Sequence, residues 1–232
     1  MSTRALTFEQ ALTSNHLILS ELQSPAVITQ LKSVSGLTDT LNKWQQSNAL
    51  LMHTTMRILP QVGFTADAAG LHGYSEAFAD CLRTSDSQEA QTVLQDLNDS
   101  KWRVLLEHAF GCEPSPPISL TKAREIAIDM VDALQDPKLM RQMEDAKTGL
   151  AARLPENEKQ HMVARALVSV QEEVVVKHGY MGSSGYAQAQ VCLMRHSGDA
   201  VVTASIAAAT TNLYARAGIN LQQALMQATG QR

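Results

Sequence analysis

Six side chains in this sequence are candidates for contact with a ligand. Imidazole and phenol groups donate and accept hydrogen bonds, and imidazole also titrates near neutral pH. We expect these residues near helix ends, where side chains from different helices can line one pocket. The candidates are His53, His72, Tyr74, His178, Tyr180 and Tyr186. None of them is assigned a catalytic role.

Glu158 and His161 are candidate metal ligands, because they have the Glu-x-x-His spacing. On a helix this spacing brings two potential ligands to one face, but a di-iron bundle needs the pair twice, with further carboxylates. The sequence contains the pair once, just after Pro155, where acidic residues favour the start of a helix. We therefore interpret Glu158 as a helix-start residue and expect neither a metal nor another cofactor.

Two further features could carry covalent chemistry. The GSSG stretch at Gly182–Gly185 resembles a phosphate loop or a nucleophile elbow, but it lacks the Lys-Ser/Thr of a P-loop and follows an expected helix. We interpret it as a turn. The cysteines are three in number and widely spaced, at Cys81, Cys112 and Cys192. They predict free thiols in a reducing compartment, which indicates a cytoplasmic protein.

His178 ends an apolar stripe that we expect on one helix face, formed by Val163, Leu167, Val170 and Val174. Burial there would lower its affinity for a proton, so it could act as a pH-responsive latch or contact a ligand. We favour a structural role, in which the ring bonds a free carbonyl at the helix end.

The sequence motifs that mark helix starts and helix stops around these residues occur twice in the chain. Leu-Gln-Ser-Pro at Leu22–Pro25 returns as Leu-Gln-Asp-Pro at Leu134–Pro137, and Gly63-Phe64 returns as Gly179-Tyr180. Each proline suits the first position of a helix, with the preceding Ser or Asp as its N-cap. Each glycine suits a left-handed helix stop, after which Asp67 or Ser183 could cap the next helix. Landmarks repeated in the same order predict an internal duplication.

The fold class that follows is all-α, with two tandem copies of a repeat of about five or six helices packed together. Few aromatic residues, and many Ala and Leu, favour helices over strands. The expected boundaries are a first repeat over 1–111, a Pro-rich linker over 112–118 and a second repeat over 119–232. Residues 119–134 place five apolar side chains on one face. The uncharged stretch between Asp199 and Arg216 predicts a central helix buried all round.

The second half resembles a helical repeat of multi-repeat proteins of dinoflagellate algae. The resemblance covers about Leu120 to Leu213 and is carried by LQDPKLMRQM and VQEEVVVKHGYMGSSGY. The first half departs from it, since Leu59-Pro60-Gln61-Val62 precedes its glycine. The resemblance implies a helical repeat and supplies no general activity for any residue.

Charge excludes one class of partner. The net charge is −4, and no Lys/Arg cluster exceeds two residues, so the basic patch that nucleic-acid binding requires is absent from the sequence. We also expect no signal peptide and no membrane span. The sequence favours a non-enzymatic binding or scaffold protein, with an inter-repeat groove for a small apolar ligand or a partner helix. The alternative is an enzyme or cofactor carrier with a His/Tyr-lined pocket at the repeat interface.

Overall fold

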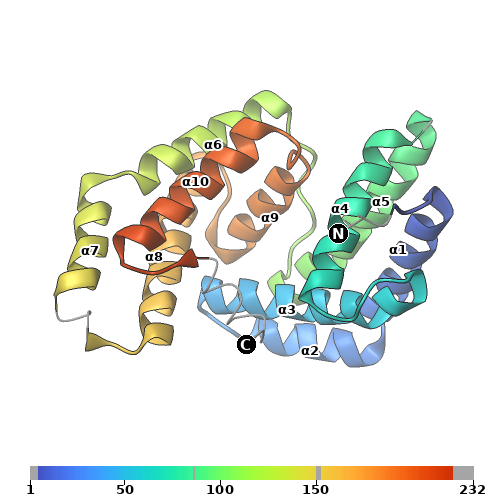
Figure 1. Ribbon diagram of the computed structural model, residues 1–232, viewed down its shortest axis with the longest axis horizontal. Coiled ribbons are helices and arrows are strands. Elements are labelled where there is room, and N and C mark those ends of the chain that lie inside the picture. The colour runs from blue at the N-terminus through green and yellow to red at the C-terminus, as the bar shows by residue number, and fades with distance from the viewer. Residues whose placement is uncertain (1–4, 86, 150–152, 222–232) are drawn as a thin grey trace. The chain divides into compact units, whose positions relative to one another are not determined.

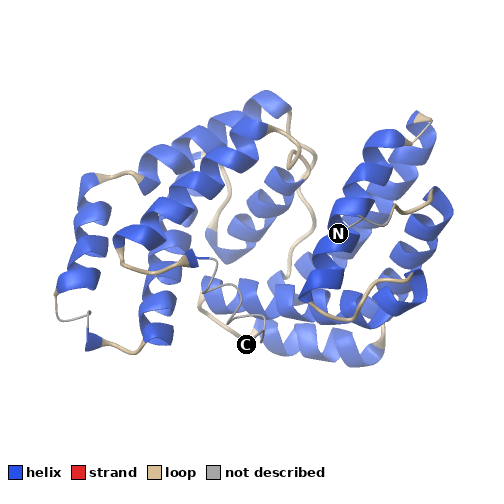
Figure 2. Ribbon diagram, in the orientation of Figure 1, coloured by secondary structure: helices blue, strands red, loops and turns tan. Residues whose placement is uncertain are grey.

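The computed structural model describes residues 5–85, 87–149 and 153–221. Within these ranges every regular element is a helix, and none is a strand (Figure 2). The all-α prediction is therefore confirmed. None of the described helices combines the length and the apolar character that crossing a bilayer requires.

The chain divides into two compact units. The first comprises Met1–Thr38 and Asn42–Pro114, and the second comprises Asp39–Leu41 and Ser115–Arg232. The division after Pro114 falls within the segment that the sequence predicts as a linker. Cys112–Ser119 contains no helix.

Helices of unequal length build the first unit (Figure 1). Its first helix packs against its last long helix, and its second helix packs against the short π-helical turn that ends the unit. The elements are α1 (Phe8–Leu22), α2 (Pro25–Ser35), α3 (Thr40–Ile58, of which the first two residues fall in the second unit), the 3₁₀ turn η1 (Leu59–Val62), α4 (Ala68–Thr84), α5 (Gln88–Leu105) and the π turn η2 (Leu106–Phe110).

In the second unit, as in the first, the first helix packs against the last long helix. Its first and last described helices lie side by side (Figure 1). The elements are α6 (Leu120–Leu134), α7 (Pro137–Thr148), α8 (Glu156–Lys177), α9 (Gly182–Met194) and α10 (Ala200–Arg216). A core that includes Leu134, Met143, Val163 and Leu213 joins α6, α7, α8 and α10. The predicted face of α6 is confirmed: its five apolar residues are fully buried.

The predicted helix starts are confirmed at both Leu-Gln-x-Pro sites. Pro25 opens α2 and Pro137 opens α7, where the missing N–H of proline is harmless. The Ser24 side chain accepts a hydrogen bond from the Val27 amide, and the Asp136 carboxylate accepts from Lys138 and Leu139. These bonds satisfy amide groups that the first turn of a helix leaves unpaired.

The predicted helix stops are confirmed as well. Gly63 has φ +83° and Gly179 has φ +91°, which is the left-handed region that glycine enters without a Cβ penalty. In both cases the aromatic residue that follows donates its amide to a carbonyl five residues earlier, Phe64 to Leu59 and Tyr180 to Val175. This six-to-one hydrogen bond defines a Schellman motif.

The second glycine of each repeated passage permits a close backbone approach. A Cβ on Gly70 would lie 1.9 Å from the Thr65 carbonyl oxygen, and a Cβ on Gly185 would lie 2.4 Å from the Tyr180 carbonyl carbon. In both passages the obstructing residue is five positions earlier. In both passages, the loop that joins the two helices therefore packs against the first turn of the following helix, with the same five-residue separation between the contacting residues.

Two local predictions are wrong. Asp67 caps α4 as expected, but Ser183 lies inside the first turn of α9, which begins at Gly182 without a side-chain cap. Helix α10 is not buried all round: Val202, Ala209, Leu213 and Tyr214 are buried, whereas several of its Ala and Thr residues are exposed. Small uncharged side chains carry little penalty in water, so their presence does not specify burial.

Candidate functional site

A buried polar cluster lies among α1, α4 and α5 of the first unit. This buried polar cluster consists of Ser14 and Asn15 from α1, Tyr74 from α4 and Lys101 from α5. Ser14 and Asn15 have no exposed surface, and Lys101 exposes 8%. Buried polar groups at this depth are expected to be hydrogen-bonded to one another.

The hydrogen bonds of the cluster converge on Asn15 and Tyr74. The Lys101 Nζ donates to Asn15 Oδ1 at 2.7 Å, and Asn15 Nδ2 donates to Tyr74 Oη at 3.1 Å. Tyr74 Oη lies 2.9 Å from Ser14 Oγ. The Ala11 carbonyl accepts from both α1 side chains, at 3.0 Å from Ser14 and 2.7 Å from Asn15. Lys101 is thus linked through neutral groups to the backbone of α1.

Burial perturbs the ionisation of the Lys101 amine. Burial disfavours the charged ammonium and lowers the pKa of Lys101 to about 8. The Nζ lies over the ring of Phe78, 5.6 Å from its centroid. Burial also raises the pKa of Tyr74, against the opposing effect of hydrogen bonds from Ser14 and Asn15. Within the described ranges, Lys101 has no ion pair with a carboxylate.

Sequence reasoning missed Lys101, although its position carries a signal. Leu94, Leu97, Lys101 and Leu105 follow the three-and-four spacing of one helix face. A lysine in such a stripe is expected to be buried or to extend its amine to the rim. Only the packing of α1 and α4 over α5 shows that the amine stays inside.

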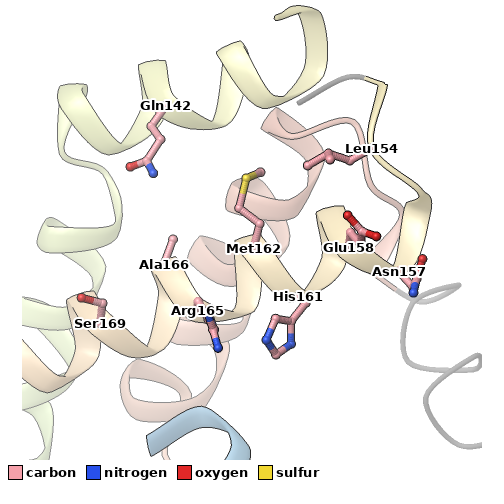
Figure 3. Close-up of a pocket in the computed structure, with 9 residues that line it drawn as sticks. All are labelled: Gln142, Leu154, Asn157, Glu158, His161, Met162, Arg165, Ala166 and Ser169. Carbon is pink, nitrogen blue, oxygen red and sulfur yellow. The ribbon is translucent and has the colours of Figure 1, made fainter. Parts of the chain in front are cut away.

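The second unit contains an open pocket between α7 and α8, with a volume of about 770 Å³. Figure 3 shows Met162 and Ala166 pointing from α8 towards α7, where Gln142 faces them. Both apolar residues also pack against the core of the unit, so the floor of the pocket continues that core. The lining residues are Gln142, Leu154, Asn157, Glu158, His161, Met162, Arg165, Ala166 and Ser169.

The polar residues of this pocket bring little net charge. Glu158 and Arg165 oppose each other in sign, and Arg165 Nη2 also lies 3.4 Å from Asp39 Oδ2. His161 also belongs to the lining, about one turn of α8 from each of them. Glu158 and His161 therefore share the pocket, as their spacing predicts. No group of three or more potential metal ligands occurs in the described part of the chain.

The predicted residues of the first half occupy different surroundings. His53 is exposed on α3. His72 is exposed on α4, where its Nε2 lies 3.5 Å from Glu76 Oε1 on the same helix. Tyr74 points inward from α4 and belongs to the buried polar cluster. Of these three candidates, the structure thus brings Tyr74 into a site.

The predicted residues of the second half lie around the end of α8 and the start of α9. Tyr186 is buried and donates to Gln171 Oε1 at 3.0 Å, and its pKa is raised first by burial and then by the Glu172 carboxylate. Burial also raises the pKa of Tyr180 to about 12, and the nearby Cys192 thiol adds to the effect.

The expected carbonyl bond of His178 is wrong. Its Nε2 lies 2.9 Å from Asp129 Oδ2, a carboxylate oxygen of α6, and its side chain exposes 9%. The residue follows the last turn of α8 at the end of the apolar stripe, as predicted. Sequence spacing could not identify this partner, because Asp129 is 49 residues away on another helix.

Cys81, Cys112 and Cys192 form no disulfide; Cys81 and Cys192 are buried, and Cys112 is partly exposed. Comparisons of the chain with protein-family models, with curated proteins and with solved structures give no match. The resemblance to dinoflagellate repeats therefore stays an expectation.

Proposed function

We propose that this chain is a non-enzymatic helical binding protein, and that the α7–α8 pocket of its second unit holds a small ligand. The main support for this proposal is the size and the lining of the pocket. Its volume of about 770 Å³ falls within the range of roughly 300–1,000 Å³ that is usual for small-molecule sites. An apolar floor with a few polar groups around it is also the usual composition of such sites.

The lining supports a neutral amphiphile as the class of ligand. Leu154, Met162 and Ala166 offer apolar contact, and methionine adapts its shape to a bound group. Gln142, Asn157 and Ser169 offer neutral hydrogen bonds. The charges of Glu158 and Arg165 offset each other, so a strongly charged ligand gains no net attraction from the lining.

We further propose that the two units are copies of one repeat. The helix starts at Pro25 and Pro137 precede helices of 11 and 12 residues, and the helices before them both have 15. Matching Schellman stops and matching close approaches at Gly70 and Gly185 support the same interpretation. An experimental structure in which the units fail to superpose helix by helix would contradict it.

The binding proposal is tested with Nile red, a neutral dye whose emission brightens and shifts to the blue in apolar surroundings. We expect saturable binding with one strong site. Ala166→Leu places extra volume in the pocket and should weaken binding by about tenfold, a loss that corresponds to about 1.4 kcal/mol. The matched control is Ala164→Leu, the same change at a half-buried position of α8 outside the lining.

Two results would contradict the proposal. One is linear, unsaturable dye emission with the wild-type protein, which indicates no defined site. The other is an equal loss of binding in Ala166→Leu and Ala164→Leu, which indicates that altered packing of α8, and not filling of the pocket, controls the dye. Circular dichroism on all three proteins verifies that the helices are intact.

A further inference from the structure

The Lys101 amine has fewer hydrogen-bond partners than an ammonium group can use. An ammonium has three N–H donors. The structure gives Lys101 one acceptor, Asn15 Oδ1 at 2.7 Å, and one ring face, that of Phe78. A neutral amine needs fewer acceptors, so these surroundings fit the uncharged form better than the charged form.

The groups in contact with this amine are the neutral amide of Asn15 on α1 and the aromatic ring of Phe78 on α4. The hydroxyl groups of Ser14 and Tyr74 lie next to Asn15, and Cys81 is buried on the same face of α4 as Tyr74. Tyr74 and Cys81 are the titratable groups on that face of α4, and both are neutral when protonated. No carboxylate of the described residues pairs with Nζ. A negative charge formed at Lys101 would therefore meet hydrogen-bond donors and no ion-paired carboxylate.

We propose that Lys101 is a carbamylation site, where CO₂ adds reversibly to the Nζ that Asn15 holds within the buried polar cluster. Access limits the electrophile to a small, uncharged and apolar molecule, because Lys101 exposes only 8% and burial of a charged reagent is unfavourable. Carbon dioxide meets these requirements. The lowered pKa of Lys101 supports the site by making the free amine abundant near pH 8.

The reaction balances without an oxidant or a reductant. The Nζ lone pair forms a bond to the CO₂ carbon, and one C=O π pair moves onto oxygen. The nitrogen then releases one proton to the solvent. Overall, R–NH₂ and CO₂ give R–NH–COO⁻ and H⁺, so the side chain changes from a cation or neutral amine to an anion.

The cluster contains groups that can stabilise this product. The carbamate N–H can keep its bond to Asn15 Oδ1. Hydroxyl hydrogens rotate to suit their acceptor, so the Ser14 and Tyr74 hydroxyls can turn from their present acceptors towards the new carboxylate. Hydrogen bonds from hydroxyl donors to an ionised acceptor are stronger than those between neutral groups.

The test is ¹³C NMR of the full chain equilibrated with ¹³C-labelled bicarbonate near pH 8. We expect a carbamate resonance that is absent from Lys101→Met. Tyr74→Phe keeps the amine but removes one donor, and should lower carbamate occupancy by about fivefold at the same CO₂ concentration. The control is Lys43→Met: Lys43 also exposes 8% and faces an aromatic ring, that of Phe110, but it has no such polar cluster. Its resonance pattern should match the wild type.

A second measurement locates the adduct without any substitution. Alkylating the wild-type carbamate with a trialkyloxonium salt converts it into a stable ester, and peptide mass spectrometry then identifies the modified lysine. The ester on Lys101 supports the proposal. An ester confined to the N-terminal amine or to other lysines, or a carbamate resonance that persists in Lys101→Met, would overturn it.

Discussion

At the scale of single residues, Lys101 should make stability depend on pH in the alkaline range. Its ordinary pKa of 10.5 falls to about 8 in the folded protein, so between these values the unfolded chain binds a proton that the folded chain does not. Stability therefore rises with pH through this window. The difference of about 2.5 between the two pKa values corresponds to about 3 kcal/mol.

Chemical denaturation of wild type and Lys101→Met at several pH values from about 7 to 10.5 measures this effect. Relative to the variant, the wild type should gain stability by about 3 kcal/mol across the series, because the variant has no proton to release. All other titrating groups are shared and cancel in the comparison. Parallel profiles would show that the Lys101 amine keeps its ordinary proton affinity.

The pair formed by His178 and Asp129 allows a second prediction at this scale. The carboxylate is about half exposed, so solvent screens the attraction, but the imidazole is nearly buried. A double-mutant cycle with His178→Gln and Asp129→Asn should give a coupling energy of about 0.5–1 kcal/mol. Thermal and urea unfolding measure it. A coupling energy of zero would show that the contact between His178 and Asp129 does not stabilise the fold and that packing alone does.

At the scale of elements, Gly179 at the end of α8 and Gly185 near the start of α9 should tolerate alanine differently. Gly179→Ala forces a Cβ into the left-handed region and should cost about 1 kcal/mol, although the space around it is open. Gly185→Ala should cost more, at least about 3 kcal/mol, because its Cβ would overlap the Tyr180 backbone and the start of α9 would have to move.

Gly198→Ala is the control for this pair. Gly198 has no positive φ and nothing within 4 Å of an added Cβ, so alanine should be neutral or slightly stabilising through the unfolded chain. The three midpoints of urea unfolding give the order directly. A Gly179→Ala variant as stable as Gly198→Ala would contradict the role of Gly179 as a left-handed stop.

At the scale of the whole molecule, the second unit is discontinuous in sequence. Asp39–Leu41 belongs to it, together with the chain from Ser115 onward. Thr40 Oγ1 donates to the half-buried Glu172 Oε1 on α8 at 2.7 Å. Thr40→Val removes this bond to a charged acceptor and should destabilise the second unit by about 1–2 kcal/mol.

Hydrogen exchange followed by mass spectrometry can assign that loss to its unit. Protection should fall in α8, while α1 and α5 of the first unit keep theirs. Thr29→Val serves as the control, since the Thr29 hydroxyl is exposed and bonds only the Pro25 carbonyl of its own helix. Equal loss of protection in α1 and α8 would indicate one cooperative molecule, in which the discontinuous segment has no separate effect.

The sequence by itself determined the helices and much of their boundaries. Proline and its N-cap at Ser24 and Asp136, and glycine at Gly63 and Gly179, act through backbone geometry within a few residues. Such local rules need no knowledge of the remaining chain. The buried face of α6 was predictable for the same reason, because the period of a helix brings its apolar residues together.

Tertiary structure decided which polar residues are buried and what they meet. Lys101 and His178 both sit on apolar stripes, yet Lys101 meets Asn15, 86 positions away, and His178 meets Asp129 on α6. Helix periodicity gives the face of a residue but not the helix that covers it. The burial of α10 does not follow from its sequence for the same reason: its small side chains suit either environment, so the pairing of helices decides which face is covered.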